Sequence, residues 1–349
     1  MKLKKLSEKI LRSIKSRGFS NITLDPVLET KYILQRSGEN FKKFLFSFYD
    51  LNGKELCLRP DLTISSVIRF IQNKNDNREK VFYSGEAFRK TYQKKDSIIK
   101  NQIGYEILGS KNKQKDDKEI IDTSLKILKS SSFKKSVLKI GNVELFNLLI
   151  DKLDIPRRWK TRLKKYYWNE NYFNELLKRL ETNSDIDPVF VEIDKSRYQK
   201  MRKESQSKSI AGRTYKEVLD RFNMKIKDPR KSSKGKKNTN IIKKFLKIKC
   251  PLEKAPKVLN SFFKKNRINI VVGKGFFPLI INKNLKVEFS ASNGREVELY
   301  SSMIFSVEVK IKSKFKNFIS GGRYDQLTSN LGFKKIPAVG AAVNMNLYE

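Results

Sequence analysis

Polar side chains that could bind a small ligand recur in the first third of the chain, at spacings typical of a site. The stretch Leu58-Arg59-Pro60-Asp61-Leu62-Thr63 predicts a strand end followed by a helix N-terminus, because Pro is tolerated there and Asp and Thr are good capping residues. In the later run Gln102-Ile103-Gly104-Tyr105-Glu106, polar and apolar residues alternate. Alternation of this kind puts Gln102, Gly104 and Glu106 on one face of a strand, and we predict that the glycine leaves room for a ligand.

Two paired strands are needed to position these residues. We predict one strand over Lys80–Arg89 and another over Ile98–Leu108, joined by a polar loop. This pairing would bring Arg89 beside the polar residues of the second strand and beside Asp61 and Thr63 on the helix. Carboxylates accept hydrogen bonds from ammonium groups and ring N–H groups, while Arg binds carboxylates. The set therefore predicts a pocket for one small polar molecule.

Missing and scarce residue types exclude several kinds of chemistry. The chain has 349 residues and no histidine, so it lacks the commonest general base and the commonest metal ligand. Cys57 and Cys250 are the only cysteines, which imply neither a disulfide framework nor a zinc site. Catalysis by Ser–His or Cys–His pairs is excluded, and no metal or other cofactor is implied.

The formal net charge of +39 permits two interpretations. A charge of this size can mark a nucleic-acid-binding protein. The lysines, however, are spread along the whole chain beside Asn, Ile and Ser, which favours a general compositional bias. Even the basic stretch Lys225–Asn240, which has almost no apolar residue, is predicted to be a surface loop rather than a nucleic-acid arm.

Apolar runs are too short to span a bilayer, and the N-terminal segment lacks the continuous apolar core of a signal peptide. We therefore expect no membrane partner and a cytoplasmic location, with a basic organelle transit peptide as the alternative.

The order of patterns along the chain predicts an α+β fold. Strand patterns dominate both ends, while helical periodicity dominates the middle, so we expect an antiparallel sheet flanked by helices. Three segments are expected: residues 1–154 as the first part of a core, 155–264 as a helical, basic insertion, and 265–349 as strands that complete the core. Within the last segment, the Gly321-Gly322-Arg323-Tyr324-Asp325 stretch predicts a turn leading into a helix.

These pieces, taken in order, resemble the class II aminoacyl-tRNA synthetase core, specifically that of histidyl-tRNA synthetase. The resemblance rests on Leu58–Thr63, Phe88-Arg89, Gln102–Glu106, Gly294-Arg295, Gly321–Asp325 and Val339-Gly340, and it covers residues 26–346. No single motif is specific, but the ordered set is.

The resemblance implies a pocket for histidine. Residues matching Asp61, Thr63 and Gln102 hold the amino group of the ligand in that family. Those matching Glu106 and Tyr300 reach the imidazole. Two arginines complete the set. Arg295 matches the residue that faces the carboxylate, and Arg89 matches one that contacts ATP phosphate; we place both among the histidine-binding residues.

Departures from the synthetase pattern bear on function. Thr91 replaces a Glu that positions ATP, and Leu347 replaces an Arg that lies under the adenine. A leucine supplies neither the cation–π contact nor the charge of arginine. Leu299 stands where a Tyr is expected, and the sequence stops at Glu349, before any anticodon-binding domain.

A synthetase-like core with these losses resembles the family of ATP phosphoribosyltransferase regulatory subunits. That resemblance implies a non-catalytic subunit that acts in the first step of histidine biosynthesis and senses histidine for feedback inhibition. It also implies a short-form catalytic subunit as partner, in a hetero-octamer that contains dimers of the synthetase-like chain. The alternative is a degenerate synthetase-like enzyme that activates an amino acid without reading an anticodon.

Overall fold

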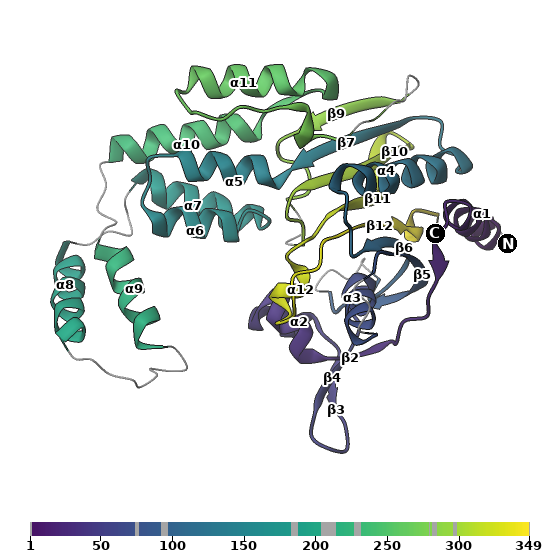
Figure 1. Ribbon diagram of the computed structural model, residues 1–349, viewed down its shortest axis with the longest axis horizontal. Helices are drawn as coiled ribbons and strands as arrows, with labels where there is room; N and C mark the ends of the chain where they lie inside the picture. The colour runs from purple at the N-terminus through teal and green to yellow at the C-terminus, as the bar shows by residue number, and fades with distance from the viewer. Residues whose placement is uncertain are drawn as a thin grey trace.

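A nine-stranded sheet forms the centre of the protein (Figure 1). The computed structural model describes residues 2–73, 77–91, 97–182, 188–203, 214–226, 232–278, 280, 285–295 and 299–348. Neighbouring strands run antiparallel except for two parallel pairs, β1 with β5 and β7 with β9. In spatial order the strands are β1 (Ser20–Asn21), β5 (Glu79–Phe88), β6 (Ile99–Leu108), β12 (Ala338–Asn344), β11 (Lys314–Arg323), β10 (Met303–Ile311), β7 (Ser136–Asn142), β9 (Lys286–Ser290) and β8 (Lys249–Pro251). The expected α+β class is confirmed.

Strands from the two ends of the chain meet in the middle of this sheet. The C-terminal strand β12 pairs with β6 from Ala338 opposite Leu108 to Asn344 opposite Gln102. It pairs on its other side with β11. The two halves of the predicted core are therefore joined by backbone hydrogen bonds between distant parts of the sequence.

Three short strands from the N-terminal part of the chain form a second, small sheet. Its order is β2-β4-β3, and the tight turn between β3 and β4 contains Gly53 at φ +77°, a conformation that favours glycine. The two short strands near the N-terminus belong to different sheets, because β1 joins the large sheet and β2 the small one. The elements are β2 (Val27–Glu29), β3 (Ser47–Tyr49), β4 (Glu55–Leu58), α1 (Lys2–Lys15), α2 (Thr30–Ser37), the 3-10 helix η1 (Glu39–Phe44) and α3 (Leu62–Gln72).

The main core lies between the large sheet and helices α1 and α4 (Lys113–Ser130). Buried side chains of α4, such as Ile120 and Ile127, pack against strand residues such as Ile107 and Phe305. On α4 these apolar residues recur on one helical face, while on the strands they alternate. This core fixes the face of the sheet opposite to the pocket described below.

A second core is formed by helices beyond one side of the sheet. It includes Phe146, Trp159, Phe173 and Phe245, and also Phe289 from the edge strand β9. The helices of this core are α5 (Val143–Lys152), α6 (Arg157–Lys165), α7 (Glu170–Thr182), α10 (Ser232–Leu246) and α11 (Ala255–Lys265). Helices α8 (Pro188–Lys203) and α9 (Tyr215–Ile226) contribute no described residue to it, and Figure 1 shows them as a separate pair. Because this core draws residues from both sides of positions 154 and 264, the three-segment division stays a prediction.

The basic stretch Lys225–Asn240 is largely helical, so the loop expected there is wrong. Residues 227–231 lie outside the described ranges, but α10 begins at Ser232. A Cβ atom on Gly235 would lie 2.1 Å from the carbonyl oxygen of Leu180, so the glycine lets α10 approach α7 closely. Asn238 is buried and donates a hydrogen bond to the Asp154 carbonyl at 3.2 Å. The helix is stabilised by this packing, which the composition of the stretch does not reveal.

Gly321, Gly322 and Arg323 continue strand β11 instead of forming the predicted turn. Gly322 pairs with Gly340 of β12, and a Cβ atom on Gly322 would lie 2.6 Å from the Tyr300 ring. Here the glycines permit close packing of neighbouring side chains against the sheet. The helix expected after them is the short α12 (Leu327–Asn330).

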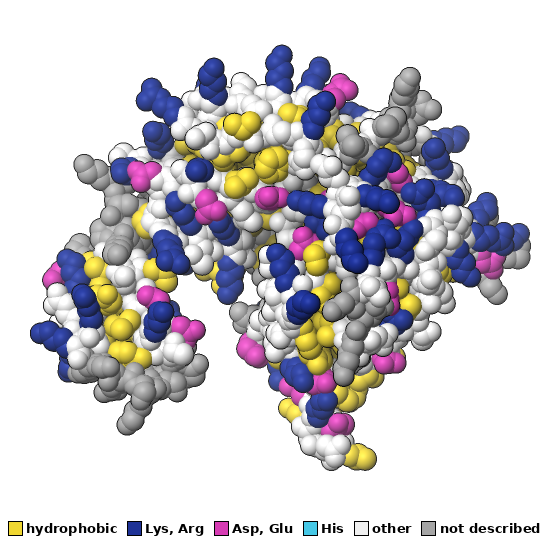
Figure 2. All heavy atoms as spheres, in the orientation of Figure 1, with side chains coloured by type: hydrophobic (Ala, Val, Ile, Leu, Met, Phe, Trp, Pro, Cys, Tyr) yellow, Lys and Arg dark blue, Asp and Glu magenta, His cyan; other side chains and the backbone are white. Residues whose placement is uncertain are grey.

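Basic side chains are distributed over the visible face of the protein, as Figure 2 shows, and cover several elements. This distribution agrees with the interpretation of the charge as a compositional bias. Among the described residues, no helix combines the length and the apolar character needed to cross a membrane.

Candidate functional site

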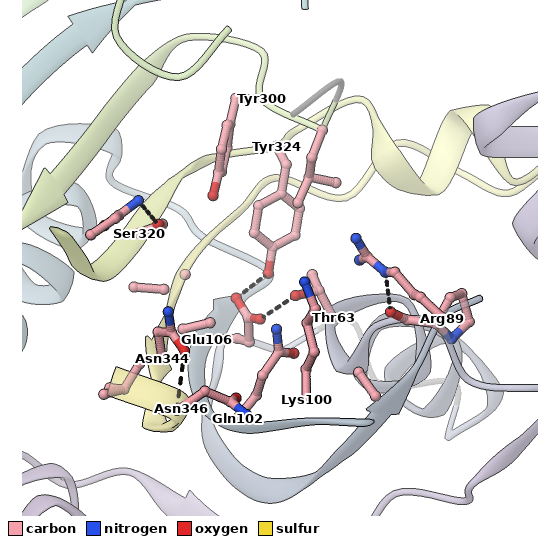
Figure 3. A pocket seen from close by; sticks show the side chains of 18 of the residues that line it. Thr63, Arg89, Lys100, Gln102, Glu106, Tyr300, Ser320, Tyr324, Asn344 and Asn346 are labelled. Carbon is pink, nitrogen blue, oxygen red and sulfur yellow. Dashed lines mark hydrogen bonds between the residues drawn. The ribbon is translucent and has the colours of Figure 1, made fainter. Parts of the chain in front are cut away.

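A cavity of about 720 Å³ opens on the face of the sheet where β5, β6, β12 and β11 lie side by side (Figure 3). Helix α3 contributes Thr63 to its wall, and the segment before β10 contributes Leu299 and Tyr300. Five of the predicted site residues line it: Thr63, Arg89, Gln102, Glu106 and Tyr300. The size suits a small molecule.

Glu106 forms the floor of this pocket and is only 2% exposed. Its Oε1 atom accepts hydrogen bonds from the Tyr83 hydroxyl at 2.6 Å and from Thr63 Oγ1 at 3.1 Å. Its Oε2 atom accepts one from the Tyr324 hydroxyl at 2.5 Å. Three hydroxyl groups therefore fix the carboxylate, and one of its roughly four acceptor positions stays available for a ligand.

Burial raises the pKa of Glu106 from its usual value of 4.5 to about 7. Hydrogen bonds from Tyr324, Tyr83 and Thr63 oppose this shift, while the nearby charge of Asp61 adds to it. Desolvation wins because the hydroxyl groups are neutral and bring no positive charge. The pocket floor is thus an acid that changes charge close to neutral pH.

Two glycines shape the surroundings of Glu106. A Cβ atom on Gly340 would lie 1.4 Å from Oε2 of Glu106, so the carboxylate occupies the space that this glycine leaves. A Cβ atom on Gly104 would lie 2.3 Å from the ring of Tyr83. The expectation that Gly104 makes room for a ligand is therefore wrong, because Tyr83 fills that space and donates to Glu106 instead.

Asp61 and Arg89 lie at the side of the pocket. Asp61 is the N-cap of α3, where its Oδ1 atom accepts a hydrogen bond from the backbone N–H of Ile64 at 3.0 Å. Its other oxygen lies 4.0 Å from Nη2 of Arg89, and Arg89 Nε donates to the Pro60 carbonyl at 2.7 Å. Asp61 caps the helix as its type suggests, and it does not belong to the residues that line the cavity.

Arg295 lies elsewhere, contrary to the expectation that it joins the other site residues. Its guanidinium group lies 4.6 Å from the ring centroid of Phe173 and 5.3 Å from that of Tyr167. Its Nε atom donates to the Tyr167 carbonyl at 3.1 Å, and its side chain lies 3.8 Å from Glu170. Cation–π contacts and burial hold this arginine against the α6–α7 region.

The positions that depart from the synthetase pattern have apolar surroundings. Leu347 is partly buried against the main core, and Leu299 packs beside Tyr300 against a smaller cluster. Leu299 also lines the cavity. Neither leucine can offer charge to a nucleotide phosphate.

Residues that the sequence analysis did not place in the site contribute much of its chemistry. Tyr83 and Tyr324 donate directly to Glu106, and Lys100 and Lys316 line the cavity from β6 and β11. Period-two spacing from Gln102 marks Lys100 as sharing its strand face, so this residue was detectable from the sequence. Tyr83 and Tyr324 required knowledge of which strands pair.

Metal chemistry has no visible support in this site. Within the described ranges, no three acidic or cysteine side chains gather closely enough to hold a metal ion. What the arrangement can do is bind a small zwitterion, because it combines a buried acid, hydroxyl and amide groups, and cations.

Comparison with known proteins gives a consistent family. A family model described as histidyl-tRNA synthetase matches residues 1–224. The ATP phosphoribosyltransferase regulatory subunit of Allorhizobium ampelinum is 24% identical, over 97% of this chain and 95% of its own length. The protein of the same name from Sinorhizobium fredii is 23% identical, over 93% of this chain and 90% of its own.

Solved structures show the same fold. A structure described as an ATP phosphoribosyltransferase regulatory subunit/histidyl-tRNA synthetase from Bacillus halodurans matches with a TM-score of 0.59 at 18% identity, covering 99% of this chain and 77% of that one. A histidine–tRNA ligase subunit from Alicyclobacillus acidocaldarius matches with a TM-score of 0.57 at 17% identity, covering 99% of this chain and 91% of that one. The expected synthetase-like fold is confirmed.

Proposed function

This chain belongs to the histidyl-tRNA synthetase family, and we propose that it is a regulatory, non-catalytic subunit of ATP phosphoribosyltransferase that senses histidine. The observation that carries the proposal is the extent of the match. Relatives named as such regulatory subunits align over nearly all of this chain and nearly all of their own length. The chain thus has the size of these relatives as well as their sequence pattern.

The chemistry of the pocket supports histidine as the ligand. Glu106 can accept a hydrogen bond from an imidazole N–H, and Gln102 and Thr63 can bind the amino group. Charge-assisted hydrogen bonds of this kind contribute about 1.5–3 kcal/mol each. Three or four of them give micromolar-to-millimolar affinity after the cost of association, which is a useful range for sensing a free amino acid.

The residues at positions 347 and 91 make ATP-dependent activation of an amino acid unfavourable. Leu347 packs against the main core, where a synthetase is expected to present arginine to ATP. Thr91 stands where the ATP-positioning carboxylate is expected. Arg89 lines the cavity, however, and it keeps the degenerate-enzyme alternative worth testing.

Regulation by histidine would follow from linkage. If histidine binds one conformation of the complex more tightly than another, the difference in affinity shifts the complex toward that conformation. Coupling free energies of about 1–3 kcal/mol are typical and give 5- to 150-fold effects. The partner in this scheme is a short-form catalytic subunit, assembled with dimers of this chain in a hetero-octamer.

The test combines this chain with a short-form ATP phosphoribosyltransferase catalytic subunit from the same genome. Formation of phosphoribosyl-ATP is expected to require this chain and to fall when histidine is added. With Glu106→Ala, we expect histidine affinity to decrease roughly tenfold or more while activation of the partner is retained. The Glu86→Ala variant, at an exposed position on the neighbouring strand, is the matched control.

Two outcomes would contradict the proposal. If this chain leaves the partner's activity unchanged, the regulatory function is wrong. If the isolated chain catalyses ATP–pyrophosphate exchange with any amino acid, the synthetase-like alternative is favoured instead.

A further inference from the structure

A second, basic pocket lies between α10 and the end of α11, apart from the cavity on the sheet face. Its volume is about 260 Å³, and four of the residues that line it are cations: Lys237, Lys244, Lys265 and Arg267. No acidic residue lines it. Ring contacts of Phe245 with residues of α11 hold the two helices side by side, and Figure 1 shows both at the top of the view. Figure 2 shows basic side chains along this end of the molecule.

The cations of this pocket differ from other lysines of the same helix. Lys234 pairs with Asp154 at 2.8 Å, and Lys243 pairs with Glu181 at 3.1 Å. Among the residues that the structure describes, no carboxylate lies within ion-pair distance of the four pocket cations. A hydrogen bond and the charge of Lys234 lower the pKa of Asp154, to which Lys237 adds only a weaker effect. The pocket therefore holds positive charge that the protein does not balance nearby.

Arg267 occupies a backbone position that disfavours arginine. Its φ is +55°, in the left-handed region. The N–H of Arg267 donates to the Lys264 carbonyl at 3.0 Å, and the N–H of Ile268 donates to the Phe263 carbonyl at 2.9 Å. This pattern ends a helix, and its left-handed residue is usually glycine and sometimes asparagine. In a chain rich in lysine and asparagine, compositional bias does not explain an arginine held in a strained conformation, and such strain is commonest at functional positions.

The surroundings of the cations favour an anion. Carbonyl groups at the end of α11 carry partial negative charge, but hydrogen bonds cover them. Besides the two bonds just described, Asn266 Nδ2 donates to the Phe262 carbonyl at 2.8 Å. Ile241 adds an apolar wall and is 7% exposed. Charges of one sign beside an apolar wall concentrate the electric field in a cleft, so this pocket attracts anions more strongly than cations on a convex surface.

We propose that this pocket binds a diphosphate group, free or carried by a nucleotide. The volume is below the range of about 300–1,000 Å³ that encloses a whole drug-sized ligand, so it suits one group of a ligand. The guanidinium group of Arg267 can donate two parallel hydrogen bonds to phosphate oxygens, and the lysines act as point charges. A diphosphate balances four cations better than a carboxylate does. No aromatic residue lines the pocket to stack a base, which disfavours a nucleic-acid strand.

Calorimetric titration of the full chain with inorganic diphosphate, at about 0.15 M salt, tests this site. We expect a dissociation constant below about 1 mM and an affinity at least about tenfold higher than for orthophosphate. Arg267→Asn should weaken diphosphate binding about tenfold or more, because it removes the bidentate donor. Asparagine suits the left-handed backbone, so this variant keeps the helix end. Lys244→Gln should weaken binding by a smaller factor.

The matched control is Lys243→Gln. It removes the same single charge from the neighbouring position of α10, where the lysine pairs with Glu181, and it should leave the affinity within about twofold. A parallel titration with ATP identifies the source of the diphosphate. ATP that binds at least as tightly, with the same dependence on Arg267, assigns the site to a nucleotide. Binding of inorganic diphosphate alone, again dependent on Arg267, assigns it to the free anion.

Four results would overturn the proposal. The unmodified protein could bind neither inorganic diphosphate nor ATP. An unchanged affinity in Arg267→Asn would place the binding elsewhere, for instance in the cavity on the sheet face. Equal losses in Arg267→Asn and Lys243→Gln would indicate a diffuse positive field. A uridine oligomer of about ten nucleotides that binds more tightly than diphosphate, through Arg267, would indicate a nucleic-acid surface instead. The histidine-sensing function is independent of all four results.

Discussion

Two buried carboxylates, Asp117 on helix α4 and Glu106 on strand β6, have opposite environments. Asp117 of α4 contacts Arg323, whose Nε donates to Asp117 Oδ1 at 2.8 Å and whose Nη1 donates to Asp325 Oδ1 at 3.0 Å. Arg323 and Asp117 are 1% and 6% exposed as side chains. Glu106 is as deeply buried, but the side chains that bind it are the hydroxyls of tyrosine and threonine.

The contrast separates structural from ligand-binding chemistry. A buried carboxylate paired with a buried guanidinium has its charge balanced within the protein, and its site has no need of a ligand. The carboxylate of Glu106 is solvated by hydroxyl groups only, so its charge is left to be balanced by a ligand or by a proton. Burial raises the pKa of both carboxyl groups, but at Asp117 the Arg323 charge opposes the shift, whereas at Glu106, whose pKa rises to about 7, only neutral hydroxyl groups oppose it. Three predictions test this distinction.

The largest effect is expected from breaking the ion pair. Asp117→Ala leaves the buried Arg323 guanidinium with Asp325 as its remaining carboxylate partner, and we expect the free energy of unfolding to fall by about 3–5 kcal/mol. Urea denaturation followed by circular dichroism measures this. Replacing both partners, Asp117→Leu with Arg323→Met, should restore much of the loss, because no deeply buried charge then lacks its partner and the Asp325 side chain is 24% exposed. A loss below about 1 kcal/mol, the value for an exposed pair, would remove the contrast.

A smaller effect is expected from the pH dependence of Glu106. Its pKa is raised from 4.5 to about 7 by folding, so the folded protein binds more protons than the unfolded chain between these values. The stabilisation is therefore present at low pH and is lost as the pH rises toward 7. Glu106→Gln cannot titrate.

From pH 5 to pH 8, the free energy of unfolding of the unmodified protein should fall by about 2–3 kcal/mol relative to that of Glu106→Gln. Denaturation curves at several pH values measure this difference, with Glu86→Gln at an exposed position as the control. A difference that is independent of pH would contradict the balance of burial and hydrogen bonding inferred for Glu106.

The smallest effect is expected from filling the space beside Glu106. Gly340→Ala puts a methyl group where Oε2 of Glu106 lies, and displacement of the carboxylate should cost about 1–3 kcal/mol and weaken histidine binding. Gly273→Ala is the matched control, because its Cβ atom would have no neighbour within 4 Å. Equal stability and affinity in the two variants would show that Glu106 is not held against Gly340.

Local patterns predicted much of the pocket. Period two in β6 placed Gln102 and Glu106 on one face, and capping preferences placed Asp61 at the start of α3. Both patterns involve residues that are close in sequence, so they can be recognised without knowledge of the fold. The same patterns failed for α10, where the packing of Gly235 against α7 outweighs the polar composition.

The sequence alone determined the fold class, the polar face of β6 and the family to which the chain belongs, because these depend on short-range spacing and on ordered motifs. Only the tertiary structure decided that Tyr83 and Tyr324 hold Glu106 and that Arg295 packs against Tyr167. The pairing of β5 with β6 and of β12 with β6 brings these groups together across long stretches of sequence. Contacts between distant segments depend on strand register and on packing energies, which no local pattern encodes.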